Sequence, residues 1–127
     1  MGAAIECFKG AAAICVPRSR FAPVKTTADL FTLRSDAYET TKDGRIALVK
    51  EREGKPPVVS LSDEYKLVDS LEGLGVPSLK LATKLTLNGP VRFGDMVEIR
   101  GTVSISNENP GTSWVANGIY RDEDVVL

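Results

Sequence analysis

The feature that most constrains the fold is a six-residue period in the C-terminal half of the chain. Two sets of apolar residues, two positions apart, recur with this period. They are Leu85, Val91, Val97 and Val103, and Leu87, Phe93, Ile99 and Ile105. Turn-forming pairs such as Asn88-Gly89 and Gly94-Asp95 separate them. Short apolar-polar-apolar sides joined by turns at this spacing predict a small left-handed parallel β-helix of the hexapeptide-repeat type.

An antiparallel meander is the alternative, because glycine-rich turns between short alternating strands also make hairpins. Four matches in register at both apolar positions favour the β-helix. Three sides make a coil of about 18 residues, so four units form little more than one coil and need further cover. We expect this cover from another chain or from other residues of this one, namely Trp114, Val115, Ile119 and a helix that carries Leu67 and Leu71.

The residues before the period predict short helices and a hairpin, so the predicted fold class is α+β. The expected elements are helices over 3–13, 28–39 and 62–71, a hairpin turn over 42–45, a strand over 46–49 and a charged, frayed end over 121–124. Residues 50–57 hold five charges, a glycine and a double proline. Such a run is either a surface loop or a boundary between domains over 1–55 and 56–127, and we predict the boundary.

Composition restricts the classes of function. The 127 residues are 43% hydrophobic and 26% charged, which suits a soluble domain with its own core. The net charge of −1 and the absence of a long apolar run argue against nucleic-acid and membrane partners. We expect a cytoplasmic protein. Cys7 and Cys15 lack metal-ligand spacing, and the chain has no histidine, so no metal site is predicted and both thiols are expected to be buried.

Residues with chemical potential concentrate in the segment over 16–30. It holds three cations, Arg18, Arg20 and Lys25, and two stiffening prolines. Thr26 and Asp29 form a capping-box-like pair, which predicts that a helix begins there. Free backbone N–H groups would then lie beside Lys25 and form an anion site suited to phosphate. On these residues alone, a half-solvated edge strand is the favoured explanation, because charge-plus-cap patterns recur without function.

A family resemblance changes that balance. The run Val16-Pro-Arg-Ser-Arg-Phe-Ala-Pro-Val-Lys25, followed by Thr26-Thr27-x-Asp29-Leu30 and Ser35-Asp36-x-Tyr38, resembles the signature block of eukaryotic UTP–glucose-1-phosphate uridylyltransferases, the UDP-glucose pyrophosphorylases. Gly2-Ala-Ala-Ile-Glu-Cys-Phe8 and Val76-Pro-Ser-Leu79 are similar to the same family, in the same order. The likeness extends to about residue 105, and Ala22 stands where leucine is common in the family.

The resemblance implies an enzyme that joins glucose 1-phosphate to UTP and releases UDP-glucose and pyrophosphate, with Mg²⁺. It implies that Lys25 is the catalytic, phosphate-contacting lysine and that Arg18 and Arg20 support its loop. The nucleotide loop and sugar-binding residues of that family lie upstream of this region, and no Mg²⁺ ligand is expected here. We therefore expect the C-terminal portion of such an enzyme, inactive by itself, in which residues 1–55 end the catalytic domain.

The sequence pattern suggests two other functions. A non-enzymatic assembly module is compatible with the enzyme reading, because the end of a β-helix offers strand surface for self-association. We expect a homo-oligomer on this ground. A hexapeptide-repeat acyltransferase is disfavoured, because those enzymes use a histidine base and this chain has none.

Overall fold

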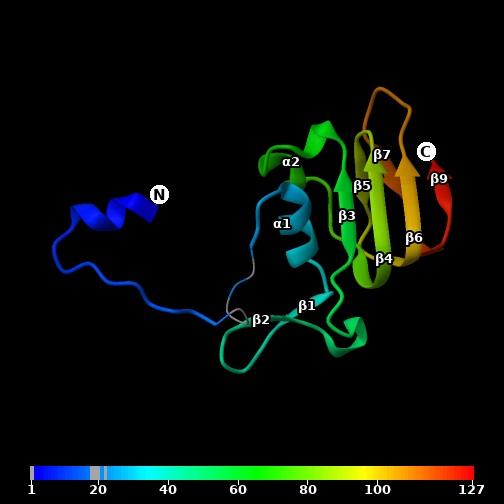
Figure 1. The fold of residues 1–127 in the computed structure, drawn as a ribbon. Coiled ribbons are helices and arrows are strands. Elements are labelled where there is room, and N and C mark those ends of the chain that lie inside the picture. The colour runs from blue at the N-terminus through cyan, green and yellow to red at the C-terminus, as the bar shows by residue number, and fades with distance from the viewer. Residues whose placement is uncertain (1, 18–20, 22) are drawn as a thin grey trace.

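The computed structural model describes residues 2–17, 21 and 23–127, which form a mixed α/β fold with few helices and parallel sheets (Figure 1). Three-residue-per-turn helices are labelled η. The elements are η1 (Gly2–Cys7), α1 (Thr27–Leu33), β1 (Tyr38–Thr40), β2 (Ile46–Leu48), η3 (Lys50–Arg52), β3 (Val58–Leu61), η4 (Asp63–Tyr65), α2 (Asp69–Glu72), β4 (Ser78–Asn88), β5 (Val91–Phe93), β6 (Val97–Ser106), β7 (Ser113–Val115), β8 (Gly118–Arg121) and β9 (Asp124–Val126).

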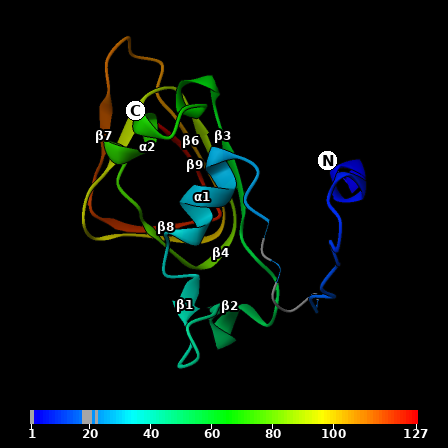
Figure 2. The same cartoon turned by 90° about the vertical axis from the view of Figure 1, so that its left-hand side faces the viewer.

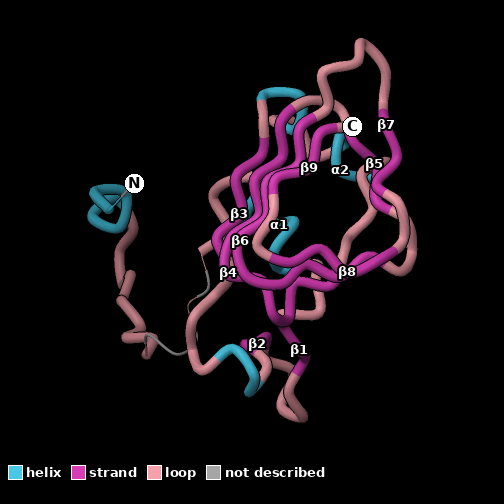
Figure 3. Tube along the Cα trace, turned by 90° about the vertical axis from the view of Figure 1, so that its right-hand side faces the viewer, coloured by secondary structure: helices cyan, strands magenta, loops and turns pink. Residues whose placement is uncertain are grey.

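The C-terminal strands pair in parallel and stack. Strands β3, β4 and β6 lie side by side, and β8 and β9 both pair with the other edge of β6. Leu85 lies opposite Val103, a separation of 18 residues, as three six-residue sides require. Figure 3 shows the chain winding around a common core. The parallel arrangement is therefore confirmed, and the antiparallel meander is wrong.

The core of this coil consists of the residues that the six-residue period selects. All eight are buried: Leu85, Val91, Val97, Val103, Leu87, Phe93, Ile99 and Ile105. Side chains two positions apart on a strand point to the same side, so one short strand contributes two of them to the interior. The prediction of the core from the period is confirmed.

One end of the coil is covered by α1, which lies across its opening (Figure 2). Phe31 of α1 is 1% exposed, and its ring centroid lies 6.4 Å from that of Phe93. Tyr65, Leu71 and Leu74 join the same core. The sequence predicted Leu71 as cover, whereas no pattern in it identified Phe31 or Tyr65 in this role.

Three of the predicted covering residues are wrong. Trp114 is 62% exposed, and Ile119 and Leu67 are exposed as well. Strand alternation explains the first: Val115 faces inward, as predicted, so its neighbour Trp114 faces solvent. In β8 the half-buried Tyr120 packs on the core and Ile119 faces outward for the same reason.

The helices are shorter than predicted. The helix expected over 3–13 is replaced by η1, because a short helix with no packed face is marginal in water. The helix expected over 28–39 ends at Leu33, since the Ser35 hydroxyl donates to the Thr32 carbonyl and accepts the Ala37 N–H and so turns the chain into β1. The helix expected over 62–71 is divided into η4 and α2.

The predicted hairpin is confirmed, and the predicted frayed end is wrong. Strands β1 and β2 pair antiparallel, and Gly44 in their turn has a φ of 76°, which suits glycine. At the C-terminus, β9 pairs with β6, and Asp122 Oδ1 accepts the Thr102 N–H at 2.8 Å. Paired backbone and a carboxylate contact hold this end on the coil despite its charges.

The N-terminal segment lies away from the coil (Figure 1). Both cysteines are on it and are exposed, so the prediction of buried thiols is wrong. Large apolar side chains of the segment are exposed too, among them Ile5 and Phe8. The division into domains over 1–55 and 56–127 stays a prediction. No helix in the described part of the chain is long and apolar enough to cross a membrane.

Candidate functional site

Lys25 lies directly before α1 and is exposed, as the sequence predicted. The predicted capping box is confirmed. Thr26 is the N-cap residue with an extended backbone, and its Oγ1 accepts the Asp29 N–H at 3.2 Å. The Asp29 Oδ2 in turn accepts the Thr26 N–H at 2.9 Å. Two reciprocal bonds thus fix the start of the helix next to Lys25.

The Asp29 carboxylate changes the expected chemistry of this helix start. Its Oδ2 also accepts the Lys25 N–H at 2.9 Å, so the backbone N–H groups of residues 25 and 26 are already bonded. These bonds, to Lys25 first and to Thr26 second, lower the pKa of Asp29 and keep the carboxylate charged. The N–H groups of residues 25 and 26 are therefore not free, contrary to the expectation beside Lys25, whereas those of Thr27 and Ala28 in the first turn of α1 have no hydrogen-bond acceptor among the described residues. The exposed Lys25 ammonium is available to attract an anion.

A shallow pocket of about 320 Å³ lies beside this loop. Its lining residues are Val24, Lys25, Thr26, Thr27, Leu30, Lys66 and Val68. Lys66 comes from the turn after η4, so two cations from distant parts of the sequence line the pocket. Lys66 Nζ lies 3.1 Å from Asp63 Oδ2 at the surface, whereas no carboxylate of the described residues is within ion-pair distance of the Lys25 ammonium.

The other predicted features of the site have separate outcomes. Arg18 and Arg20 lie outside the described residues, so their support of the loop stays a prediction. Within residues 2–17, 21 and 23–127, no three metal-ligating side chains gather into a group that could hold a metal ion.

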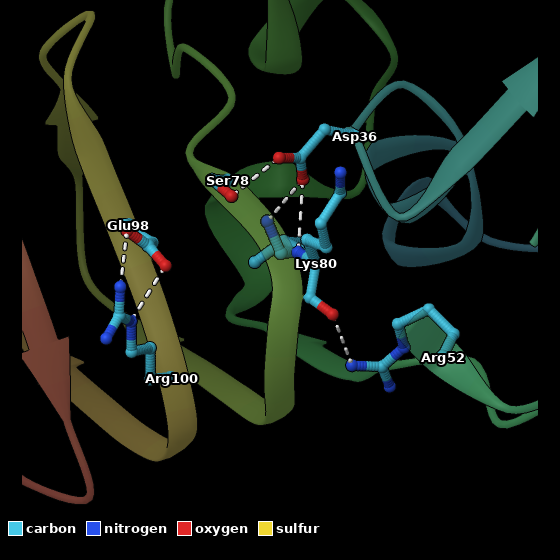
Figure 4. A network of polar contacts seen from close by, with 7 residues as sticks. Asp36, Arg52, Ser78, Lys80, Glu98 and Arg100 are labelled. Carbon is cyan, nitrogen blue, oxygen red and sulfur yellow. Dashed lines mark hydrogen bonds and ion pairs between the residues drawn. The ribbon is translucent and has the colours of Figure 1, made fainter. Parts of the chain in front are cut away.

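The far end of α1 is held against the coil by a contact that no sequence pattern predicted. The Asp36 carboxylate accepts hydrogen bonds from the Ser78 hydroxyl, the Leu79 N–H and the Lys80 N–H (Figure 4). The segments that carry Asp36 and Ser78 were both part of the family resemblance. Nothing in the sequence spacing of Asp36 and Ser78 predicts that the two residues are in contact.

The comparisons with known proteins agree on one family. The family model described as UTP–glucose-1-phosphate uridylyltransferase matches residues 1–100. The chain is 40% identical to UTP–glucose-1-phosphate uridylyltransferase 2 of Dictyostelium discoideum and 35% identical to the Saccharomyces cerevisiae enzyme. Each alignment covers 98% of this chain and 25% of the relative. The chain thus spans about a quarter of the length of these curated relatives.

Solved structures show the same likeness. A mutant UDP-glucose pyrophosphorylase from Leishmania major superposes with a TM-score of 0.85 at 45% sequence identity, over 100% of this chain and 27% of that one. A UDP-glucose phosphorylase from Trypanosoma brucei gives 0.82 at 48% identity, over 100% of this chain and 29% of that one. At such identities the likeness concerns sequence and fold together.

Proposed function

Because the chain belongs to the UTP–glucose-1-phosphate uridylyltransferase family, we propose that it is the C-terminal portion of an enzyme that forms UDP-glucose. The substrates in this proposal are UTP and glucose 1-phosphate, and the second product is pyrophosphate. The observation that carries the proposal is the position of Lys25: an exposed cation, directly before a capped helix, in the block that resembles the family signature.

In the proposed mechanism the sugar phosphate attacks the α-phosphorus of UTP, and negative charge grows on the leaving pyrophosphate. Catalysis of such a step consists mainly of positioning and electrostatic stabilisation. Lys25 contacts the phosphates and stabilises this charge. A lysine ammonium is a compact cation on a flexible stem, which suits oxygens that move during the reaction. Arg18 and Arg20 support the Lys25 loop in this proposal.

The Mg²⁺ implied by the family does not fit the described residues, which lack a ligand cluster. Its ligands would come from the part of the enzyme that lies outside these 127 residues, and no step of the mechanism above depends on this chain binding it. The same reasoning makes the chain inactive by itself, because the machinery that holds UTP and the sugar would also lie elsewhere.

Two further parts of the proposal concern fold and location. The coil is a left-handed β-helix of the hexapeptide type, which the six-residue period and the 18-residue register of β4 on β6 support. The protein works in the cytoplasm, which suits two exposed, unbridged cysteines because thiols persist in a reducing compartment.

A complementation assay tests the enzyme proposal. The purified chain is assayed for UDP-glucose formation alone, and then together with the Dictyostelium relative from which the matching C-terminal quarter has been removed. We expect no turnover from either part alone and turnover from the mixture. Turnover by the chain alone would contradict its proposed inactivity, and a mixture without turnover, although both parts fold, would contradict the proposal that it completes this enzyme.

A second function, self-association, is favoured by the exposed apolar side chains of the N-terminal segment. These side chains include Ile5, Phe8, Ile14 and Val16. Soluble monomers seldom leave contiguous apolar surface uncovered. A homo-oligomer with this segment in its interface would cover these side chains.

A further inference from the structure

The outer edge of β4 has a strand neighbour along only part of its length. Strand β4 pairs with β6 from Ser78 to Asn88, whereas β3 pairs with it only over residues 84–87. Along residues 78–83, therefore, no described strand pairs with the outer edge. An edge of this kind leaves backbone N–H and C=O groups that need partners.

The donors of this edge bind Asp36. Its Oδ1 accepts the Leu79 N–H at 2.8 Å and the Lys80 N–H at 3.1 Å, and its Oδ2 accepts the Ser78 hydroxyl at 2.6 Å (Figure 4). A carboxylate only accepts hydrogen bonds, so it suits an edge that presents N–H groups. Bonds of this charged type are roughly twice as strong as neutral ones.

The acceptors of the same edge bind Arg52. Its Nη1 donates to the Lys80 carbonyl at 3.3 Å and to the Ala82 carbonyl, and its Nε donates to the Lys55 carbonyl at 2.9 Å. A guanidinium only donates, so it complements the carboxylate. Asp36 therefore accepts hydrogen bonds from the N–H groups of this edge, and Arg52 donates hydrogen bonds to its carbonyl groups.

Two irregularities in β4 explain why side chains are used at this place. The register of β4 on β6 shifts between Ser78 and Leu81 and again between Ala82 and Lys84. Bulges bend a strand and disrupt its ladder, so a regular partner strand would fit poorly here. Single side chains do not have to match the regular spacing of a strand, so they can bind the groups of the bent edge.

We propose that Asp36 and Arg52 are positioning residues that together replace a neighbouring strand on β4 and thereby hold α1, and with it the Lys25 loop, in a fixed orientation on the coil. Asp36 follows the last residue of α1, Leu33, by three positions, while Lys25 precedes the first by two. A seven-residue helix is about 10 Å long. Loss of the Asp36 hydrogen bonds would let α1 tilt about its buried residue Phe31, and this tilt would displace Lys25. The role of this orientation in phosphate contact rests on the proposed function. The joint itself, meaning the contacts of Asp36 and Arg52 with the edge of β4, does not.

Hydrogen exchange of the intact chain tests the joint. In Asp36→Ala we expect the amides of Leu79, Lys80 and α1 to exchange at least about tenfold faster, the factor for the loss of one hydrogen bond to a charged group. The amides of β6, such as Ile99 and Val103, should keep their protection. Asp43→Ala is the matched control, because that exposed carboxylate contacts only its own hairpin through Thr41 and Arg45.

A distance measurement separates positioning from stability. Spin labels are attached at Lys25→Cys and Thr102→Cys, with Cys7 and Cys15 replaced by serine. The distance distribution should be narrow in this background and should broaden when Asp36→Ala or Arg52→Ala is added, but not with Asp43→Ala. Ser78→Ala removes only one of the three hydrogen bonds to Asp36 and should broaden the distance distribution less. This milder variant keeps the test possible if Asp36→Ala or Arg52→Ala fails to fold.

Three results would overturn the inference. The first is an unchanged distance distribution in both Asp36→Ala and Arg52→Ala. The others are unchanged amide exchange in α1 of Asp36→Ala, or a uniform loss of amide protection that includes β6. None of these measurements uses a substrate. The distance measurements could support the joint while Lys25→Ala still gives normal activity in the complementation assay. This result would contradict the proposed role of Lys25 but not the inference about Asp36 and Arg52.

Discussion

The Ser78 hydroxyl donates a hydrogen bond of 2.6 Å to Asp36 Oδ2 across 42 residues of sequence. This contact joins the turn after α1 to the first residue of β4. In the arrangement proposed above, the coil orients the loop that carries Lys25 through this contact, in addition to the capping box at the start of α1. By this proposal, the conformation of the candidate site depends on residues from both halves of the chain.

The first prediction concerns the charge of Lys25. In the complementation assay, Lys25→Ala should lower kcat/KM by at least about a hundredfold, the scale for loss of one contact made to charge in the transition state. Lys42→Ala is the control, because that lysine lies in the hairpin turn. A loss under about threefold for Lys25→Ala would return this residue to an ordinary surface lysine.

The second prediction concerns the Tyr65 hydroxyl. It accepts the Val91 N–H at 2.7 Å and donates to the Val91 carbonyl at 3.1 Å, in a buried setting that also raises the pKa of Tyr65. Tyr65→Phe leaves this N–H without its partner and should lower the free energy of unfolding by about 1–3 kcal/mol in urea titrations. Tyr120→Phe, which loses one exposed bond to the Ala116 carbonyl, should cost less. Equal decreases in the free energy of unfolding for the two variants would argue against a larger contribution from the buried Tyr65 hydroxyl.

The third prediction concerns Phe31, which covers the end of the coil. Phe31→Ala should lower the free energy of unfolding by about 3–5 kcal/mol, because it leaves a cavity against Phe93. Phe31→Leu should cost less, since it fills part of that space. Ile46→Ala on the exposed hairpin should change stability by no more than about 0.5 kcal/mol. Thermal unfolding of the three variants checks the order.

The fourth prediction concerns the pH dependence of the capping box. The pKa of Asp29 is lowered in the folded chain, chiefly by the backbone N–H groups of Lys25 and Thr26. A lowered pKa means that the carboxylate stabilises the fold fully above the ordinary aspartate value of about 3.9 and loses this effect as pH falls through the folded value.

NMR titration of the Asp29 carboxyl carbon should therefore give a midpoint below the ordinary aspartate pKa of about 3.9. The amide signals of Lys25 and Thr26 should move with the same midpoint. Asp29→Asn should remove this shared transition. A normal Asp29 midpoint would contradict the bonds described at the start of α1.

The fifth prediction concerns self-association. Phe8 is 70% exposed on the N-terminal segment. If this segment lies in an interface between copies, sedimentation velocity should show a dimer or larger species, and Phe8→Glu should shift it toward monomer. Lys9→Glu also introduces a glutamate, at the next position, and changes the net charge more than Phe8→Glu does. Because it removes no large apolar side chain, it should nevertheless have a smaller effect on self-association. A compact monomer at micromolar concentration in the unmodified chain would rule the homo-oligomer out.

What the sequence determined by itself was the set of features with local causes. The six-residue period identified every core residue of the coil from Leu85 to Ile105, because strand alternation and turn spacing act over a few residues. The capping box of Thr26 and Asp29 and the hairpin turn at Gly44 depend on neighbours within four positions, and both are present. The family signature around Lys25 is likewise a contiguous pattern.

Only the tertiary structure decided which distant residues meet. Asp36 looks the same in the sequence whether its carboxylate faces water or the edge of β4, and Arg52 lies in a charged run that resembles a plain surface loop. Trp114 looked like cover for the core, yet Phe31 takes that place because α1 folds back over the open end of the coil. Such contacts span tens of residues, so they follow from the path of the whole chain, and no short pattern encodes them.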